Sequence, residues 1–341
     1  MNVSDFNYEL PEQLIAQTPI SDRDHSRLLV LNKNSGDIEH KHFYDILDYF
    51  KSGDVLIIND SKVIPARIFG KRAGTGGAVE TLLLKQIGNN KWEALTKPGR
   101  KAQIGQILEY SDNLKGTVID IIDDGKRIIE FEYKGENIYS VLDEIGNMPL
   151  PPYIKESLSD KSRYQTVYAK DLGSAAAPTA GLHFTKELMK KLTDKGVIIK
   201  NVTLHVGLGT FRPVKAVNIT EHHMHSESFY ISDDTANEII KAKKEGRRVI
   251  CVGTTSVRTV ESAFDEKYNL NKSNGETDIF IYPGYSFKIP DGIITNFHLP
   301  QSTLVMLVSA FAGRESILNA YEVAVKEKYR FFSFGDAMLI I

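Results

Sequence analysis

A change of sequence pattern between residues 63 and 133 constrains the fold more than any other feature of this chain. Six short β-type runs follow one another there, separated by Gly, Asn, Asp and Pro, without a convincing helix. They cover residues 66–70, 79–86, 92–96, 106–110, 116–122 and 127–133. Several short strands at close spacing are typical of a small β-barrel. We therefore predict a barrel in this part of the chain.

The segments on both sides have the alternating pattern of an α/β domain. Before the β-rich segment, the pattern predicts strands at residues 27–32 and 54–59 on either side of a short helix at 43–50. After it, Thr185 and Ser232 are each placed to cap the start of a helix. The remaining elements predicted after it are strands at 197–205, 248–253 and 337–341, and helices at 256–264, 302–312 and 315–329.

The order of these segments predicts the division into domains. A length of 341 residues fits about two domains. We predict a multi-domain α/β protein in which residues 1–62 and 150–341 form one discontinuous α/β domain. Residues 63–149 form the inserted β-barrel domain. The proline-rich segment 148–153 is stiff and extended, as a connection between domains would be.

Composition narrows the class of protein. The chain is 42% hydrophobic and 25% charged, as ordinary globular proteins are. The single cysteine, Cys251, excludes an intramolecular disulfide and a cysteine-based zinc site, so we expect a reducing, cytoplasmic compartment. The first ten residues contain two acids and lack a signal-peptide pattern. The longest apolar stretch, residues 304–312, is about half of what a bilayer requires, and we expect no membrane span.

Charge is distributed unevenly along the predicted barrel. Residues 62–115 contain ten Lys or Arg and four acids, a balance of +6, whereas residues 116–148 contain three basic residues and eight acids. One face of the barrel could therefore contact phosphate groups. The alternative is that these are ordinary solvated lysines. The predicted nucleic-acid contacts are Arg67, Lys71, Arg72, Lys97, Arg100 and Lys101.

Segments rich in glycine or histidine follow several predicted strands, where open α/β sheets place their ligands. In residues 205–211, the glycines Gly207 and Gly209 allow close approach of a ligand to the backbone, although a tight turn explains them nearly as well. The segment 174–185 begins with small residues, which allow close approach to the backbone, and continues to His183. His183 could act on a ligand there, or it could be satisfied within a packed loop. The Gly-Gly pair at 76–77 is typical of a hairpin turn.

Two further segments carry groups suited to proton transfer or anion binding. Residues 221–227 contain three histidines and two glutamates, which favours acid–base chemistry by His225 and Glu227. A metal site is the alternative there, but no thiolate or His-Glu-x-x-His pattern accompanies it. Residues 253–258, Gly-Thr-Thr-Ser-Val-Arg, could hold a carboxylate or a ribose. No P-loop or dinucleotide fingerprint occurs, so neither NTP hydrolysis nor a nicotinamide enzyme is indicated.

Taken together, these segments resemble one enzyme family. The strings at 59–67 (NDSKVIPAR), 177–185 (APTAGLHFT), 205–213 (HVGLGTFRP), 253–258 (GTTSVR) and 295–300 (TNFHLP) resemble, in this order, the S-adenosylmethionine:tRNA ribosyltransferase-isomerases of queuosine biosynthesis. The likeness extends over essentially the whole chain. Departures are mild: Lys62 replaces an expected Arg, Ala175 a Val and Gln301 a Lys, and only the last could remove a charge near the site.

The resemblance implies a reaction and its participants. It implies transfer of the ribosyl part of S-adenosylmethionine to the aminomethyl group of 7-aminomethyl-7-deazaguanine in the tRNA anticodon. The product would be an epoxycyclopentanediol (epoxyqueuosine-tRNA), with release of adenine and methionine. It also implies a monomer with an inserted barrel, no metal, no redox cofactor, and S-adenosylmethionine as a consumed co-substrate; we expect no stable protein partner.

Individual residues are assigned to this chemistry as hypotheses. The candidates for proton transfer are His205, His225, Glu227, His183 and Asp60. Arg258 is expected to bind the methionine carboxylate as a fork. The predicted S-adenosylmethionine contacts are Gly207, Gly209, Thr210, Thr254, Thr255, Arg258, Asn296 and His298. Two rival functions stay open at this point: a methyltransferase that acts on RNA and yields S-adenosylhomocysteine, and a non-catalytic RNA-binding module that does not consume S-adenosylmethionine.

Overall fold

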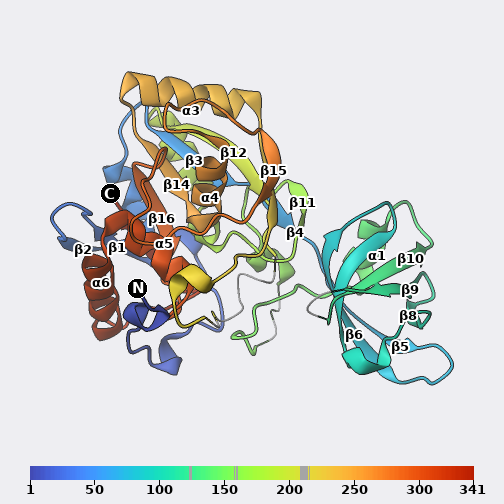
Figure 1. Cartoon of the computed structure of the whole chain (residues 1–341). Coiled ribbons are helices and arrows are strands. Elements are labelled where there is room, and N and C mark those ends of the chain that lie inside the picture. The colour runs from blue at the N-terminus through green and yellow to red at the C-terminus, as the bar shows by residue number, and fades with distance from the viewer. Residues whose placement is uncertain (123–124, 157, 159, 208–213, 215) are drawn as a thin grey trace.

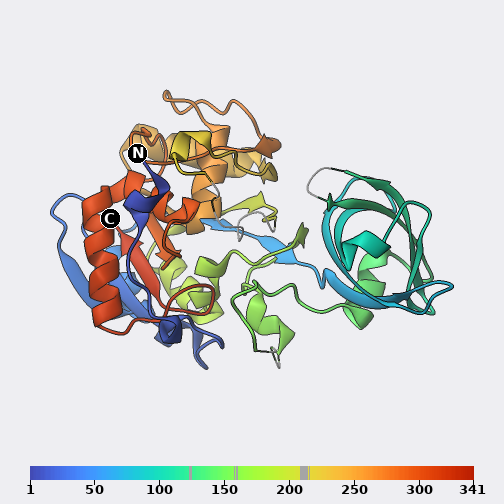
Figure 2. The same cartoon turned by 60° about the horizontal axis from the view of Figure 1, so that its bottom comes forward.

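The computed structural model describes residues 1–122, 125–156, 158, 160–207, 214 and 216–341. It has two lobes, a larger α/β lobe and a separate β-barrel (Figure 1). Few segments join the lobes, as the view in Figure 2 makes plain. Both termini lie on the larger lobe, far from the barrel, which is how an insertion into one domain appears in three dimensions.

The larger lobe is built on a nine-stranded mixed sheet. Its strand order is β15-β13-β12-β3-β14-β16-β17-β1-β2. Strands β12, β3, β14 and β16 are mutually parallel in this order, whereas β13 and β17 run antiparallel to their neighbours β12 and β16. The strands are β1 (Arg27–Leu31), β2 (Ile38–His42), β3 (Val55–Asn59), β12 (Ile198–Leu204), β13 (Glu227–Ile231), β14 (Val249–Val252), β15 (Asn274–Thr277), β16 (Gly292–Asn296) and β17 (Ala337–Ile340).

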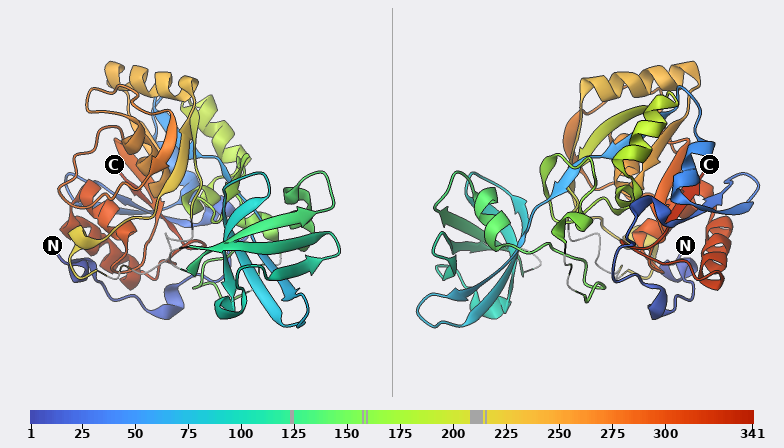
Figure 3. Two further views of the ribbon diagram at one scale, coloured as in Figure 1. Left: turned by 45° about the vertical axis from the view of Figure 1, so that its right-hand side comes forward. Right: turned by 180° about the vertical axis from the view of Figure 1, so that it is seen from behind.

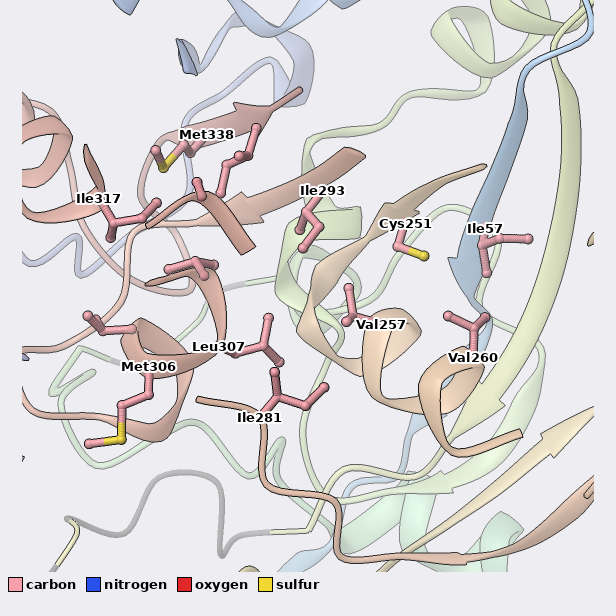
Figure 4. Close-up of a cluster of buried hydrophobic side chains, with 14 of the residues drawn as sticks. Ile57, Cys251, Val257, Val260, Ile281, Ile293, Met306, Leu307, Ile317 and Met338 are labelled. Atoms are coloured by element: carbon pink, nitrogen blue, oxygen red, sulfur yellow. The ribbon is translucent and has the colours of Figure 1, made fainter. Parts of the chain in front are cut away.

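Helices cover both faces of this sheet because its central strands are apolar on both sides. On β3, Val55 and Ile57 face one core cluster, whereas Leu56 and Ile58 face the other. The first cluster packs against α3 (Asp233–Glu245), α4 (Gly253–Ala263), α5 (Thr303–Ala312) and α6 (Arg314–Lys326). Figure 4 shows this side, with Ile57, Cys251 and Ile293 of the sheet pointing towards Val257 and Val260 of α4. The second cluster packs against α2 (Lys186–Asp194) and the 3₁₀ helix η4 (Phe43–Tyr49).

The smaller lobe is a closed barrel of six strands in the order β10-β7-β6-β5-β8-β9. All its neighbouring strands are antiparallel, and closure leaves no free edge. Figure 3 shows the barrel from two further sides. The strands are β5 (Arg67–Arg72), β6 (Ala78–Gln86), β7 (Lys91–Lys97), β8 (Ile107–Ser111), β9 (Leu114–Ile121) and β10 (Arg127–Tyr133), so all six predicted strands are confirmed.

The structure adds one helix to the barrel that the sequence analysis did not predict. Helix α1 (Ile138–Ile145) places Ile138, Val141 and Leu142 in the barrel core. The side chain of Asn137 caps it by accepting from the main-chain N–H of Ser140 at 3.0 Å. The apolar spacing of three and four residues was the available signal for this helix.

Short elements complete the chain. Near the connection between the lobes, β4 (Ser61–Val63) pairs in parallel with β11 (Asp171–Ser174). Across the lobes, Lys85 of the barrel donates to Glu276 at 2.8 Å. None of the described helices is long and apolar enough to cross a bilayer. The remaining 3₁₀ helices are η1 (Val3–Phe6), η2 (Glu12–Leu14), η3 (Arg23–His25), η5 (Gly99–Lys101), η7 (Lys161–Tyr164), η8 (Thr179–His183) and η10 (Ile219–Glu221).

Candidate active site

The carboxyl ends of the four central parallel strands meet at one edge of the sheet, and the motifs lie there. Asp60 follows β3, His205 follows β12, Gly253 follows β14 and Phe297 follows β16. Parallel strands bring these ends together although the residues are distant in sequence. The prediction that the glycine- and histidine-rich segments follow strands is confirmed at these joints.

An apolar cavity of about 230 Å³ opens at this edge. Thr254 and Thr255 of the first turn of α4 line it, together with Asn296 and His298 after β16, so the structure brings four of the eight predicted S-adenosylmethionine contacts together. The first turn of α4 has no side-chain cap, and the hydroxyl of Thr255 has no hydrogen-bond partner among the described residues. Apolar walls come from Ala177, Pro178, Val206, Phe297, Pro300 and Phe332.

The wall of the apolar cavity contains strained backbone. Gln301 and Phe332 line the cavity with φ angles of 59° and 72°, a region that non-glycine residues rarely adopt. Such conformations concentrate at ligand sites, where the surrounding structure imposes them. Gln301, the position where the family resemblance would predict Lys, donates to Asn7 at 3.0 Å.

A second cavity, of about 270 Å³, lies between the lobes, and we call it the interlobe cavity. The α/β lobe contributes His205, Gly207, His225 and Glu227 to its lining. The structure therefore brings together three of the five candidates for proton transfer. The barrel contributes the opposite wall, which includes Lys85, Trp92, Lys126 and Tyr139.

Glu227, which lines this cavity, forms a buried ion pair with Arg258. Their side chains are 4% and 5% exposed, and Arg258 donates through Nη1 to Glu227. Glu227 also accepts from the main-chain N–H of Gly207 at 2.9 Å. Arg258 lines neither cavity, and its Nε and Nη2 have no hydrogen-bond partner among the described residues. The ion pair lowers the cost of burying the Glu227 carboxylate, and α4 brings the guanidinium to it.

His205 and Asp60 lie in the same polar neighbourhood without a direct bond between them. His205 shares a hydrogen bond of 2.8 Å with Ser61 through Nδ1, and Asp60 accepts from Thr203 at 2.7 Å. Burial lowers the pKa of His205, although Asp171 and Asp60 act in the opposite direction. Burial raises the pKa of Asp60 above its ordinary value. His205 is therefore neutral near pH 7 and able to accept a proton.

His183 is not part of this group. Its Nδ1 is 2.7 Å from the hydroxyl of Ser26, and its Nε2 is 3.1 Å from the amide nitrogen of Asn296. Its ring stacks on Phe43, and burial lowers its pKa to about 3. Both ring nitrogens of His183 therefore have partners within the protein. This is the geometry of the alternative, a packed loop in which His183 is satisfied internally.

His298 faces the apolar cavity and is fixed by its own neighbours. Its Nε2 is 2.8 Å from the hydroxyl of Thr295, and its main-chain N–H donates to Tyr321 at 3.1 Å. Burial lowers the pKa of its ring to about 3, so the imidazole is neutral at physiological pH. His298 is thus a neutral hydrogen-bonding group in the cavity wall rather than a cation.

The remaining predictions for S-adenosylmethionine and metal binding concern Gly209, Thr210 and residues 221–227. Gly209 and Thr210 lie outside the described residues. His222 packs edge-on against Phe280 and does not line the interlobe cavity. No three His, Cys, Asp or Glu side chains within the described part of the chain could jointly hold a metal ion.

The six predicted RNA contacts have different local surroundings on the barrel. Arg67 and Lys71 lie on the outer face of β5, each within 3.7 Å of an acid, namely Glu80 and Glu109. Arg72 is at an alternate position of β5, so its side chain leaves the strand on the other face from Arg67 and Lys71. Its guanidinium packs over Gly77, where a Cβ atom would approach it to 2.1 Å. Lys97, Arg100 and Lys101 are exposed at the end of β7 and in η5.

Comparison with known proteins identifies the family. The family model for the queuosine biosynthesis protein matches residues 3–340. This chain belongs to the queuosine biosynthesis protein family. Two relatives, from Clostridioides difficile (strain 630) and Desulforamulus reducens, are each 57% identical over 100% of both chains. Both are named S-adenosylmethionine:tRNA ribosyltransferase-isomerase, and the resemblance stated from the motifs is confirmed.

A solved member of the queuosine family has the same architecture. The crystal structure of S-adenosylmethionine tRNA ribosyltransferase from Thermotoga maritima matches with a TM-score of 0.57 and 37% identity. The match covers 99% of this chain and 100% of that chain. The predicted fold class, a discontinuous α/β domain with an inserted β-barrel, is thereby confirmed.

The sequence did not point to several residues that surround this candidate site. Ser61 and Asp171 act on His205, and Gly173 lies so close to its ring that a Cβ atom there would approach to 3.0 Å. Trp92 and Tyr139 were not expected at the site, because their contribution depends on how the barrel is placed. Ser61 lay inside a quoted motif and was the one with a usable signal.

Proposed function

We propose that this chain is an S-adenosylmethionine:tRNA ribosyltransferase-isomerase. It transfers the ribosyl part of S-adenosylmethionine to 7-aminomethyl-7-deazaguanine at the anticodon wobble position of tRNA and isomerises it, giving epoxyqueuosine-tRNA, adenine and methionine. The observation that carries the proposal is the pair of cavities on the two sides of residues 205–207. Val206 lines the apolar cavity, whereas His205 and Gly207 line the interlobe cavity.

We assign one substrate to each cavity. S-adenosylmethionine occupies the apolar cavity, whose walls suit an adenine ring and whose polar end is the uncapped first turn of α4. With Arg258 engaged by Glu227, the main-chain N–H groups and hydroxyls of Thr254 and Thr255 hold the ribose or the methionine carboxylate. The aminomethyl base enters the interlobe cavity, next to Trp92 and Tyr139.

Proton transfer is assigned to groups around residues 205–207. The sulfonium acidifies the hydrogens on C5′, so a neutral base such as His205 can remove one of them to give an ylide. Departing adenine requires a proton, and the incoming amine must lose one before it attacks. His225 and Glu227 line the cavity in which that amine would lie. The sulphur then leaves as neutral methionine when the epoxide closes, and no redox cofactor or metal is required.

The tRNA footprint is assigned to the exposed cations of the barrel. Lys97, Arg100 and Lys101 have no ion-pair partner among the described residues, whereas Arg67 and Lys71 are close to acids. Contacts of this kind are made to phosphate and are sensitive to salt. We also propose that the enzyme acts in the cytoplasm as a monomer, without a stable protein partner.

The decisive experiment is an incubation of the protein with S-adenosylmethionine and tRNA that carries the aminomethyl deazaguanine. We expect free adenine and methionine to appear together by chromatography, only with the modified tRNA. Formation of S-adenosylhomocysteine would support a methyltransferase instead. Tight tRNA binding without any loss of S-adenosylmethionine would support a non-catalytic RNA-binding module.

A further inference from the structure

A buried chain of hydrogen bonds leads from the wall of the apolar cavity into the protein core. Thr179 donates to the amide oxygen of Asn296 at 2.8 Å, and the amide nitrogen of Asn296 lies 3.1 Å from Nε2 of His183. Nδ1 of His183 lies 2.7 Å from the hydroxyl of Ser26, which is 3.3 Å from the main-chain oxygen of Arg23. Asn296, His183 and Ser26 are all buried.

The direction of every bond in this chain follows from the chemistry of its ends. An amide nitrogen can only donate, so Nε2 of His183 accepts from Asn296 and carries no proton. The proton of the neutral ring is therefore on Nδ1, which donates to Ser26. The hydroxyl of Ser26 then donates to the main-chain oxygen of Arg23, which can only accept. On its other side the Asn296 amide accepts from the hydroxyl of Thr179, so both ends of the carboxamide are engaged.

This arrangement leaves Asn296 with a defined hydrogen-bonding capacity. A carboxamide has two N–H donors and two carbonyl lone pairs, and the chain uses one of each. One donor and one acceptor are left on a residue that lines the apolar cavity. One donor beside one acceptor matches an edge of adenine, whose N6 amino group donates and whose ring nitrogens accept.

The walls of the cavity favour a flat aromatic base over a sugar at this position. Pro300 and Phe332 present apolar surface, and Phe332 does so from a strained conformation. The uncapped first turn of α4, which also lines the cavity, suits the more polar parts of the substrate. Burial of an adenine ring here would leave its polar edge unpaired without a partner such as Asn296.

We propose that Asn296 is the residue that recognises adenine, with His183 and Thr179 as positioning residues that fix its amide. This inference rests on the proposed function for the presence of an adenine-bearing substrate. It assigns His183 a role without proton transfer. In that role the imidazole acts through Asn296 and never touches the substrate.

The experiment measures equilibrium binding of S-adenosylmethionine and of its analogue that lacks the N6 amino group. For the wild type we expect the analogue to bind at least about tenfold more weakly, which corresponds to about 1.4 kcal/mol. For Asn296→Ala we expect binding of S-adenosylmethionine to weaken to a similar degree and the preference for it over the analogue to disappear. Asn34→Ala, in an exposed turn, is the matched control.

Variants at His183 separate positioning from structural support. His183→Phe keeps an aromatic ring against Phe43 but removes the acceptor, and we expect it to lose the preference for the N6 amino group. His183→Gln offers an amide oxygen in place of Nε2, and we expect it to restore much of that preference. A purely structural role would lower the melting temperature of both variants without changing the preference.

The outcome is independent of the proposed reaction. Suppose that Asn296→Ala still prefers S-adenosylmethionine over the N6 analogue as strongly as the wild type does, and that the wild-type protein releases adenine. This result overturns the assignment of Asn296 and leaves the proposed function intact. Absence of adenine release from wild-type protein overturns the proposed function, while the binding preference still tests the adenine site. If the N6 analogue binds the wild type as well as S-adenosylmethionine does, the assignment is wrong whatever the variants show.

Discussion

At the scale of single residues, the site depends on buried polar groups whose partners are fixed. Glu227 is held by Arg258 and by the main-chain N–H of Gly207. His205 is held by Ser61. Groups held in this way do not have to reorganise during a reaction, which is the main physical advantage of an enzyme site over water.

The first prediction concerns the proposed acid–base groups. We expect Glu227→Gln and His225→Ala each to reduce the rate of adenine release by roughly 100-fold or more, because each removes a side chain to which a proton transfer is assigned. Single-turnover measurements with saturating substrates give the rate. His223→Ala, an exposed neighbour that does not line the interlobe cavity, is the control. Near-normal rates for both variants would remove these residues from the mechanism.

The second prediction concerns the pH dependence of stability. Burial lowers the pKa values of His183 and His298 to about 3, whereas an unfolded histidine titrates near 6.5. Below about pH 6.5 these histidines bind protons in the unfolded chain but stay neutral in the folded chain. The free energy of unfolding therefore falls as the pH decreases towards 3. Each histidine contributes a slope of up to about 1.4 kcal/mol per pH unit.

Urea unfolding at pH 7 and pH 5 measures this effect. We expect the loss of unfolding free energy between the two pH values to be smaller in His298→Asn than in the wild type. His25→Asn, at an exposed position, should leave the difference unchanged. An equal loss in all three proteins would show that other groups control the acid sensitivity.

At the scale of elements, local signals placed the helices well. Thr185 and Ser232 cap α2 and α3 as predicted, with hydrogen bonds of 3.0 Å and 3.2 Å to the main chain three residues later. The predicted helix at 256–264 begins earlier, at Gly253, whose φ of 82° ends β14 abruptly. That earlier start is what brings the first turn of α4 to the apolar cavity.

The third prediction tests a cap that is remote from the site. We expect Ser232→Ala to lower the free energy of unfolding by about 1 kcal/mol, because it removes the acceptor for the main-chain N–H of Thr235. Turnover should stay unchanged, since no residue of α3 lines either cavity. Denaturant unfolding and the adenine assay measure the two quantities. Ser232→Asp, which keeps an acceptor, should retain most of the stability.

Several strands escaped prediction for physical reasons. The edge strand β2 is exposed at four of its five positions, and β15 also lies at an edge, so neither has an apolar alternation. No strand was predicted at β13, and only its first residue, Glu227, was considered, as part of the histidine-rich segment 221–227. Strand pairing, rather than local pattern, forms these elements.

At the scale of the whole molecule, the placement of the barrel creates half of the interlobe cavity. The hydrogen-bonded ion pair between Lys85 and Glu276 joins the lobes beside that cavity. Glu276 also accepts from Ser226, the residue between His225 and Glu227, at 2.8 Å. The position of the barrel is therefore connected to the segment that carries the proposed acid–base groups.

The fourth prediction concerns the tRNA footprint on the barrel. We expect the double variant Lys97→Glu, Lys101→Glu to bind tRNA at least about tenfold more weakly at low salt, with a shallower salt dependence. Binding of S-adenosylmethionine should be unchanged, because the apolar cavity is in the other lobe. The control, Lys267→Glu with Lys326→Glu, makes the same charge change on the α/β lobe. Equal tRNA affinity of the variant and the wild type would place the footprint elsewhere.

The sequence by itself determined the six barrel strands, the helix caps and the order of the motifs. Each of these depends on residues close together in the chain, and hydrophobic period, turn residues and capping residues report them directly. The domain boundaries at residues 62/63 and 149/150 stay a prediction, as do the roles of the site residues.

Only the tertiary structure decided which motif residues meet. Arg258 pairs with Glu227 across 31 residues, Asn296 contacts His183 across 113, and His183 contacts Ser26 across 157. The local pattern of these residue types does not show which of them become partners. Burial makes the difference, because a polar group removed from water must take the partner that the fold places beside it.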